Sequence, residues 1–193
     1  MIRWSWRDIR SAVRGFLISL GLGGVLLSAC HSPGPYGHSK VYSPLDAELT
    51  ALHGAKAYDP VMVQRQPADW RGKPVDVFGL VRSRNDGTGG AAYVTLSVRT
   101  LEPRNLCESE DEDSCRVTVS EREYAVVHAQ VKLDAADNIG EHSVGQGSLL
   151  RVIGVLGDEV DSNDGMPVLR ASYYRHWPRN FYVTTADREN MRR

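Results

Sequence analysis

Residues 74–82 read PVDVFGLVR and residues 148–156 read SLLRVIGVL, and these two stretches decide the fold class. In the first stretch, valines at positions 75, 77 and 81 alternate with a second set that begins at Asp76, which is the period of a β-strand. Each stretch carries an interior glycine, Gly79 or Gly154. Because a glycine inside a strand marks a bend or a close backbone approach, we expect both strands to lie in a strongly curved sheet.

The strand pattern continues along the chain. Further strands are expected at residues 92–101, 115–120, 124–131 and 167–174, with turns at 85–90 and 161–165. Residues 134–147 are predicted to form a loop with one helical turn. Since helical periodicity is nearly absent from this region, the fold class is predicted to be all-β. A small barrel of five or six strands is favoured because a flat sheet would leave exposed edges.

Two segments of this region resemble OB-fold proteins, in which Gly-Lys-x-Val-x-Val-x-Gly-x-Val recurs. They are residues 69–81, DWRGKPVDVFGLV, and residues 147–155, GSLLRVIGV, which are similar to the first and fourth strands of that fold. The resemblance covers about residues 69–175 and implies an OB-like barrel that binds oligonucleotides or oligosaccharides. An immunoglobulin-like β-sandwich is the alternative fold.

The first 29 residues have a different character. Four arginines, at positions 3, 7, 10 and 14, precede the uncharged run FLISLGLGGVLL at 16–27. This run is too short for a stable transmembrane helix, which needs about 20 residues. A basic start followed by a short apolar core is typical of a signal peptide, so residues 1–29 are predicted to be removed.

The residues that follow the apolar run, Leu27-Ser28-Ala29-Cys30, resemble the lipobox of bacterial lipoproteins. The resemblance implies cleavage before Cys30 and acylation of its sulfur and its new amine by chains such as palmitate, which together anchor a protein stably. His31 replaces the aspartate that retains lipoproteins at the inner membrane of enteric bacteria, so the periplasmic face of the outer membrane is favoured. The chain also resembles the starvation-inducible outer-membrane lipoproteins, which pair a lipobox with a domain of this size.

Four segments are therefore expected: a signal peptide at 1–29, a lipid-anchored tether at 30–66 with a short helix at 44–53, an OB-like domain at 67–183 and a polar tail at 184–193. Ser43 is expected to cap the helix, Pro44 to occupy its first position, and Gly54 to end it. Leucines at 45, 49 and 52 have helical spacing, which predicts that the helix packs on the domain through an apolar face.

Two cysteines remain after Cys30, and an exported protein can keep them paired. A disulfide between Cys107 and Cys115 would close the acidic loop ESEDEDS and contribute about 2 to 3 kcal/mol. The carboxylates of this loop lack the spacing and the central glycine of a calcium loop. They are interpreted as solvated charges, and so are Asp158, Glu159, Asp161 and Asp164.

The charge balance argues against a nucleic-acid partner. Residues 1–29 hold four arginines and one aspartate, so their removal leaves 19 of 23 basic and 23 of 24 acidic side chains, a net charge near −4. A polyanion ligand requires clustered positive charge instead.

The segment YYRHWPRNFY, residues 173–182, is the nearest candidate for a ligand contact. It combines aromatic rings with arginines, and we single out Tyr174, Arg175, Trp177 and Arg179. They could stack on bases or sugars and bind a carboxylate or phosphate. The alternative is that rings of this segment close one end of the barrel while the arginines lie in solvent or on the rings.

The sequence contains no recognisable catalytic or metal-binding motif. Its six histidines, at 31, 38, 53, 128, 142 and 176, never have ligand spacing. We therefore predict no catalytic residues, no metal and no cofactor, and a lipid-anchored envelope lipoprotein with a non-catalytic binding or structural domain and an envelope protein or glycan as partner. The alternatives are an oligosaccharide- or oligonucleotide-binding module and a periplasmic enzyme. An enzyme would be favoured if His128, His142 or His176 met carboxylates in one pocket.

Overall fold

The computed structural model describes residues 34–191 of the chain. The predicted signal peptide, the lipobox and Cys30 lie outside the described residues. Within residues 34–191, no helix is both long enough and apolar enough to cross a membrane.

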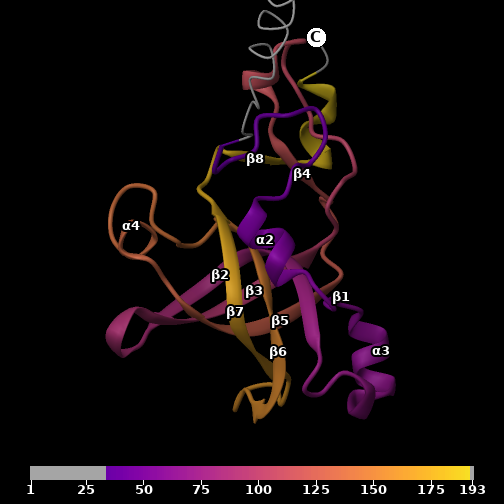
Figure 1. Cartoon of the computed structure of the whole chain (residues 1–193), viewed down its shortest axis with the longest axis vertical. Helices are drawn as coiled ribbons and strands as arrows, with labels where there is room; N and C mark the ends of the chain where they lie inside the picture. The colour runs from indigo at the N-terminus through magenta and orange to yellow at the C-terminus, as the bar shows by residue number, and fades with distance from the viewer. Residues whose placement is uncertain (1–33, 192–193) are drawn as a thin grey trace, which may run out of the picture. The chain divides into compact units, whose positions relative to one another are not determined.

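The described region is built mainly from strands, with a few short helices (Figure 1). The helices are α2 (Asp46–Ala51), α3 (Pro60–Arg65) and α4 (Ala135–Asn138). The strands are β1 (Lys56–Ala57), β2 (Pro74–Asp86), β3 (Ala91–Arg99), β4 (Val117–Val119), β5 (Ala125–Lys132), β6 (Leu149–Val160), β7 (Pro167–Trp177) and β8 (Tyr182–Thr184).

Five of these strands close into a barrel. The strand order is β1-β2-β3-β5-β7-β6, and β2 pairs with β6 as well as with β3, which completes the ring. The β5–β7 pairing is parallel, whereas the other four pairings of the ring are antiparallel. This closed order is the OB-fold arrangement, so the predicted all-β barrel is confirmed and the β-sandwich alternative is wrong.

The barrel interior is filled by the residues that the alternation predicts. Val75, Val77 and Val81 of β2 are buried, as are Val94 and the other inward residues of β3. Val63 of α3 also joins this core and is 4% exposed. Helix α3 was not predicted from the sequence; its first turn is capped by the Asp59 carboxylate and begins with Pro60.

Both interior glycines lie where the barrel needs a close backbone approach. A Cβ atom on Gly79 would lie 2.8 Å from the Cβ of Leu96 on the neighbouring strand. Gly154 stands at a register shift in the β6–β7 pairing, where a Cβ would lie 2.8 Å from the Cα of Ala171. Both glycines therefore stand at a close approach of neighbouring strands, within a sheet that curves into a closed ring.

A second apolar cluster lies outside the barrel. It contains Phe78, Val117, Val119, Leu149 and Trp177, and Trp177 has no exposed surface. The small parallel sheet of β4 and β8 packs here, at the end of the barrel opposite the β6–β7 hairpin (Figure 1). The predicted strand at 115–120 therefore exists only as the three residues of β4, and it stands outside the ring.

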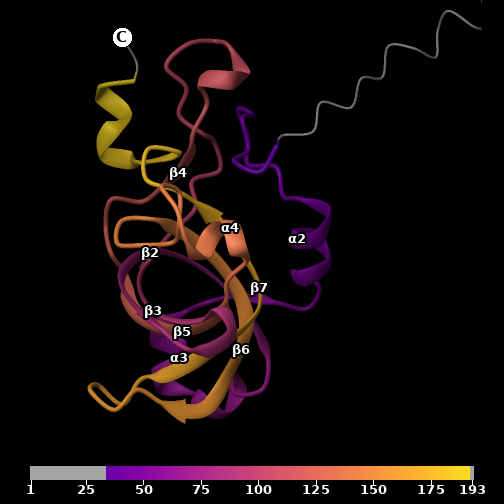
Figure 2. The ribbon, with the colours of Figure 1, turned by 90° about the vertical axis from the view of Figure 1, so that its left-hand side faces the viewer.

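The described part of the predicted tether is packed on the barrel. Trp177 Nε1 donates a hydrogen bond to the carbonyl of Tyr36 at 3.1 Å, and the Asn105 amide donates to the carbonyl of Ser39 at 2.7 Å. The segment lies beside the end of the barrel that carries β4 and then leads into α2, as Figure 2 shows. Residues 34–45 are thus part of the folded domain, which differs from the expected free linker.

Helix α2 is shorter than expected and is held differently. It begins at Asp46, and its N-cap position is Leu45, whose N–H donates to the Glu48 carboxylate at 3.0 Å. The predicted cap by Ser43 is wrong. The helix does pack on the domain, with Leu45 and Leu52 half-buried, but Leu49 is 54% exposed and the residue at the centre of the contact is the completely buried Glu48.

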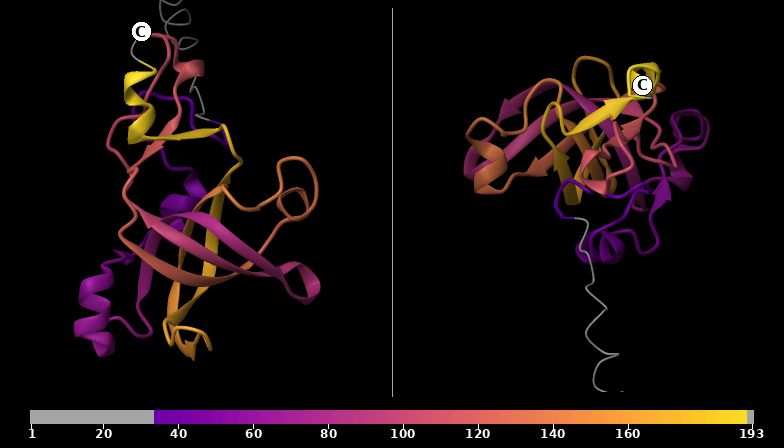
Figure 3. Two further views of the ribbon diagram at one scale, coloured as in Figure 1. Left: turned by 180° about the vertical axis from the view of Figure 1, so that it is seen from behind. Right: turned by 90° about the horizontal axis from the view of Figure 1, so that it is seen from above.

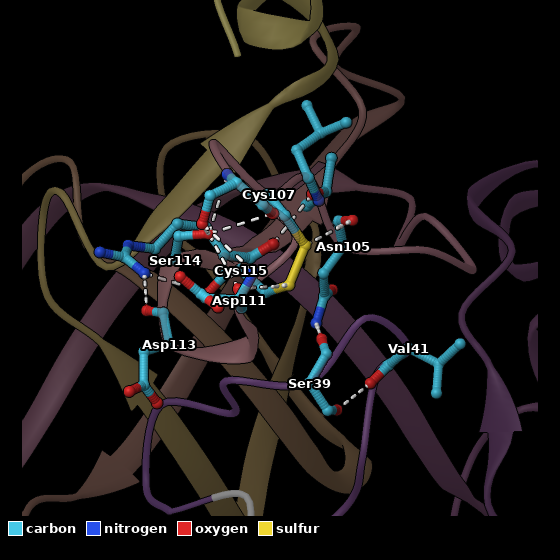
Figure 4. Close-up of a disulfide and its surroundings, with 12 residues drawn as sticks. Ser39, Val41, Asn105, Cys107, Asp111, Asp113, Ser114 and Cys115 are labelled. Atoms are coloured by element: carbon cyan, nitrogen blue, oxygen red, sulfur yellow. Dashed lines mark hydrogen bonds between the residues drawn. A yellow bond between two sulfur atoms is a disulfide. The ribbon is translucent and has the colours of Figure 1, made fainter. Parts of the chain in front are cut away.

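The predicted cysteine pair is present as a disulfide between Cys107 and Cys115 (Figure 4). Cys115 is buried, and Ser114 donates from its hydroxyl to the carbonyl of Asp111 at 3.0 Å inside the closed loop. The bridge therefore closes the exposed acidic loop at its base. Its buried half, Cys115, lies two residues before the start of β4.

Candidate functional site

The barrel has two outer faces with different environments. The first, which we call the covered face, consists of the outward residues of β2, β6 and β7 beneath residues 34–52. Helix α2 lies in front of the strands in Figure 1 and behind them in the left view of Figure 3. The second, the β3–β5 face, consists of the outward residues of β3 and β5.

The covered face is held by alternating charges. Glu48 accepts hydrogen bonds from Arg151 Nη1 at 2.6 Å and from Arg175 Nη1 at 2.8 Å, and also from the Tyr42 hydroxyl. Arg151 binds the carboxylate of Asp76 through two further bonds of 2.8 and 2.6 Å. Because the two arginines occupy paired positions on β6 and β7, one carboxylate can reach both of them.

Protonation of Glu48 is suppressed by this arrangement. Burial alone would raise the pKa of Glu48, but the hydrogen bonds from Tyr42 and Arg151 hold it below its ordinary value. Burial also raises the pKa of Tyr42, so its hydroxyl stays protonated and donates to Glu48. Each guanidinium also stacks on a ring, Arg151 at 4.8 Å from Phe78 and Arg175 at 4.7 Å from Trp177.

These contacts locate the four predicted ligand-contact residues. Arg175 and Trp177 are buried in the covered face, and the hydroxyl of Tyr174 binds the Asp137 carboxylate at 2.8 Å. Arg179 is exposed and donates to the carbonyl of Gln146 at 3.1 Å. The structure therefore does not gather the four side chains into one surface, and ligand contact by them stays a prediction.

The β3–β5 face displays polar and aromatic side chains in a regular register. Tyr93 lies opposite Gln130, and Thr95 lies opposite His128. Ser97 and Val126 form the next pair. The rings of Tyr93 and His128 are stacked, with centroids 5.8 Å apart and planes 18° from parallel. This face of an OB barrel, with the flanking β2–β3 and β6–β7 loops, is where OB proteins bind ligands.

A cluster of one histidine and two carboxylates lies on this face. The parallel β5–β7 register sets His128 beside Val168, and the turn before β7 then reaches over the imidazole. His128 Nε2 lies 2.9 Å from Asp164 Oδ2, and Nδ1 lies 3.9 Å from Asp161 Oδ2. The three donor atoms of this cluster, which we call the His128 cluster, lie within 4.8 Å of one another.

Both carboxylates are oriented by neighbouring groups. Asp161 accepts hydrogen bonds from the Asn163 N–H and from the Tyr93 hydroxyl, each at 2.8 Å, and these bonds lower its pKa. Asp164 accepts from His128 and, at 2.9 Å, from the Met166 N–H, which lowers its pKa as well. The two groups are therefore carboxylates at neutral pH. The interpretation of this turn as merely solvated is wrong for Asp161, which is 9% exposed.

A groove of about 330 Å³ lies next to the His128 cluster. Val126 and Met166, each two residues from a member of the cluster, form part of its wall. Its full lining is Pro60, Val61, Gln64, Tyr124, Ala125, Val126 and Met166. Tyr124 is 52% exposed at the edge of this groove, with the Arg122 guanidinium 5.7 Å from the centre of its ring, which gives the face an aromatic contact surface beside its polar one.

Two arginines of β2 are already paired, whereas Arg99 of β3 and Lys132 of β5, which point outward on this face, have no ion pair among the described side chains. Arg82 forms an ion pair with Glu123, whose carboxylate also accepts from the Ser97 hydroxyl. Arg84 contacts Asp86 at 2.5 Å and the carbonyl of Val144 at 2.8 Å. These arginines therefore contribute little net positive charge.

A second histidine also meets a carboxylate, in a different environment. His176 Nδ1 lies 2.8 Å from Asp137 Oδ1, and the other oxygen of Asp137 accepts from Tyr174. Burial would raise the pKa of Asp137, but the bonds from His176 and Tyr174 hold it below its ordinary value. Because only one carboxylate is present, this pair is suited to fix α4 on β7 rather than to form a ligand site.

Comparisons with known proteins add a likeness in fold. No family model and no curated protein matches the chain. Similar solved structures include a small single-stranded DNA-binding protein from Streptomyces coelicolor, at 17% identity and a TM-score of 0.32, covering 54% of this chain and 93% of that one. A candidate nucleic acid-binding lipoprotein from Klebsiella pneumoniae has 18% identity and a TM-score of 0.34, covering 70% and 99%. An OBody bound to hen egg-white lysozyme has 14% identity and a TM-score of 0.34, covering 57% and 87%. Sequence identities and TM-scores at this level do not support any inference about function.

Proposed function

We propose that this chain is a lipid-anchored, non-catalytic binding protein of the cell envelope, whose OB barrel takes its ligand on the β3–β5 face. The observation that carries the proposal is the difference between the two faces. The chain's own segment 34–52 occupies the covered face through Glu48, whereas the β3–β5 face carries an exposed ring, a groove and oriented polar groups. The fold alone does not assign a ligand, so the chemistry of the face must do so.

The charges on the β3–β5 face favour an uncharged or cationic ligand. Asp161 and Asp164 contribute negative charge at the β6–β7 turn, and Arg82 is neutralised by Glu123. The unpaired Arg99 and Lys132 lie on the same face but are separate residues of two strands and do not form a basic groove. Single-stranded nucleic acid needs a basic groove lined with stacking rings. An oligosaccharide needs an exposed ring and hydrogen-bonding groups, which Tyr124 and Gln130 supply.

We expect the membrane anchor to depend on Cys30. The wild-type chain should appear in the membrane fraction, with the mass of a chain that begins at Cys30 plus its acyl groups, because two or three acyl chains give stable anchoring. The variant Cys30→Ala should be soluble and lack the added mass. Cys107→Ser is the matched control and should remain in the membrane fraction. Equal fractionation and mass for Cys30→Ala and wild type would refute the anchor.

The ligand face can be mapped by amide chemical shifts of the ¹⁵N-labelled chain. Titration with N-acetylglucosamine trimer should perturb the amides of β3, β5 and the turn at 161–165, and Tyr124→Ala should weaken the response. A twelve-residue oligothymidylate should cause smaller shifts that vanish as salt is raised. Strong, salt-resistant shifts with the oligonucleotide, or no response to the trimer, would contradict the ligand class. Shifts confined to the covered face would contradict the assignment of the face.

A further inference from the structure

We infer that the His128 cluster binds a divalent transition-metal ion, with Zn²⁺ as the best-suited candidate. The donors are an imidazole nitrogen of His128 and carboxylate oxygens of Asp161 and Asp164, which come within 4.8 Å of one another. One nitrogen and two carboxylate oxygens form a donor set that Zn²⁺ accepts. This site is separate from the lipid anchor and does not depend on which ligand the β3–β5 face binds.

The charge of the cluster calls for a cation. Among the described residues, the ion pairs of Asp161 and Asp164 are with His128, and no lysine or arginine bridges to either carboxylate. This differs from the covered face, where Glu48 meets two guanidinium groups. Two carboxylates that share a single imidazole leave negative charge for an added ion to neutralise.

The groups behind the donors resemble the outer shell of a metal site. Thr95 Oγ1 lies 3.2 Å from His128 Nδ1, so Nε2 is the nitrogen that faces the Asp164 oxygen. Tyr93 holds the Oδ2 atom of Asp161, and a carboxylate oxygen has a second lone pair free for a metal. Such partners orient ligands and raise metal affinity.

Two donors are buried, which holds them in place before an ion binds, and the third is exposed, which leaves a path for the ion. The side chains of His128 and Asp161 are 8% and 9% exposed, whereas that of Asp164 is 42% exposed. Ligand atoms around one zinc ion lie about 3.3 Å apart, as follows from bond lengths near 2.0 Å. Movement of the exposed Asp164 can therefore close the site, and water or a ligand oxygen can take the fourth position.

Binding would also fix the β6–β7 turn. His128 belongs to β5, and the two carboxylates belong to the turn between β6 and β7, so a bound ion would join segments that are 33 to 36 residues apart. A link between them should raise the thermal midpoint of the chain, by an amount that grows with the logarithm of the ratio of free ion concentration to Kd.

The test is calorimetric titration of the chelator-treated full chain with ZnCl₂, with CaCl₂ as the comparison ion. We expect one Zn²⁺ per chain, Ca²⁺ binding at least about tenfold weaker because calcium prefers six to eight oxygen donors, and a higher thermal midpoint with Zn²⁺. His128→Gln and Asp164→Asn should each weaken Zn²⁺ binding by at least about tenfold, and Tyr93→Phe should weaken it by about tenfold.

Two matched controls make the result specific. Asp158→Asn changes an exposed carboxylate of the same hairpin, and His142→Gln changes an exposed histidine elsewhere. Both should bind Zn²⁺ as wild type does. Absence of Zn²⁺ binding by wild type, or wild-type affinity in Asp164→Asn, would overturn the inference. Because Asp164 is exposed, its variant should fold even if His128→Gln does not. The trimer titration described above reports on the ligand face separately.

Discussion

Replacing Glu48 with alanine is expected to lower the free energy of unfolding by about 3 to 5 kcal/mol, because it leaves two buried guanidinium groups without their shared carboxylate. Glu48 is completely buried and bonds to Arg151 and Arg175 at 2.6 and 2.8 Å. Arg151 keeps Asp76 as a partner, so the larger part of the loss should arise at Arg175. Urea unfolding of the variant and wild type measures the difference.

The matched control for this prediction lies on the same helix. Asp46 is exposed in the first turn of α2, and Asp46→Ala should change stability by no more than about 0.5 kcal/mol. Hydrogen exchange of residues 34–52 should also accelerate in Glu48→Ala, because this segment loses its main attachment. Equal stability and equal exchange in Glu48→Ala and wild type would show that the charges do not hold the segment on the barrel. In a chain that carries Arg175→Met, the loss of unfolding free energy caused by Glu48→Ala should be smaller than in wild type. The difference between the two losses measures the coupling of Glu48 with Arg175.

The same network gives a direction for the pH dependence. The pKa of Glu48 in the folded chain is held below its ordinary value. Its contribution to the free energy of unfolding is therefore complete above the pKa of a glutamate in the unfolded chain, about 4.3. That contribution is lost as the pH falls through the lower folded pKa, where the buried carboxylate gains a proton. The stability difference between wild type and Glu48→Ala should therefore shrink below about pH 4.

The contrast between α2 and the barrel strands shows which features a single sequence can predict. The strands were predictable because alternation of apolar and polar residues is a local signal, and Gly79 and Gly154 marked the curvature. The attachment of α2 was not, because its leucine spacing predicted an apolar contact while the actual partners, Arg151 and Arg175, lie more than 100 residues away.

The His128 cluster was missed for a similar reason. His128 and the turn at 161–165 each have an ordinary explanation when taken alone, as a strand residue and as a solvated turn. Only the parallel pairing of β5 with β7 places the turn over the imidazole, and this register is not encoded in any short motif. From the sequence, an enzyme would be favoured if His128, His142 or His176 met carboxylates in one pocket. The structure brings His128 to two carboxylates and His176 to one, and no short motif could assign these partners.

The second large effect is expected at Gly154, where alanine should lower the free energy of unfolding by about 3 kcal/mol or more. Its Cβ would lie 2.8 Å from both the Ala171 Cα and the Arg170 carbonyl carbon, which are backbone atoms of β7. Backbone atoms in a paired strand cannot rotate away as a flexible side chain can. The strain would fall on the β6–β7 pairing, which has a register shift at this glycine.

Gly157→Ala is the matched control on the same strand. The nearest atoms to a Cβ at Gly157 are 3.7 Å away, which is ordinary contact, so this variant should be as stable as wild type or more stable by up to about 1 kcal/mol. Urea midpoints of the two variants, measured in the same buffer, give the comparison. If Gly154→Ala were as stable as Gly157→Ala, β6 and β7 could not approach as closely as the structure has them. The curvature of the barrel would then have to arise from the register shift itself, with no requirement for a glycine.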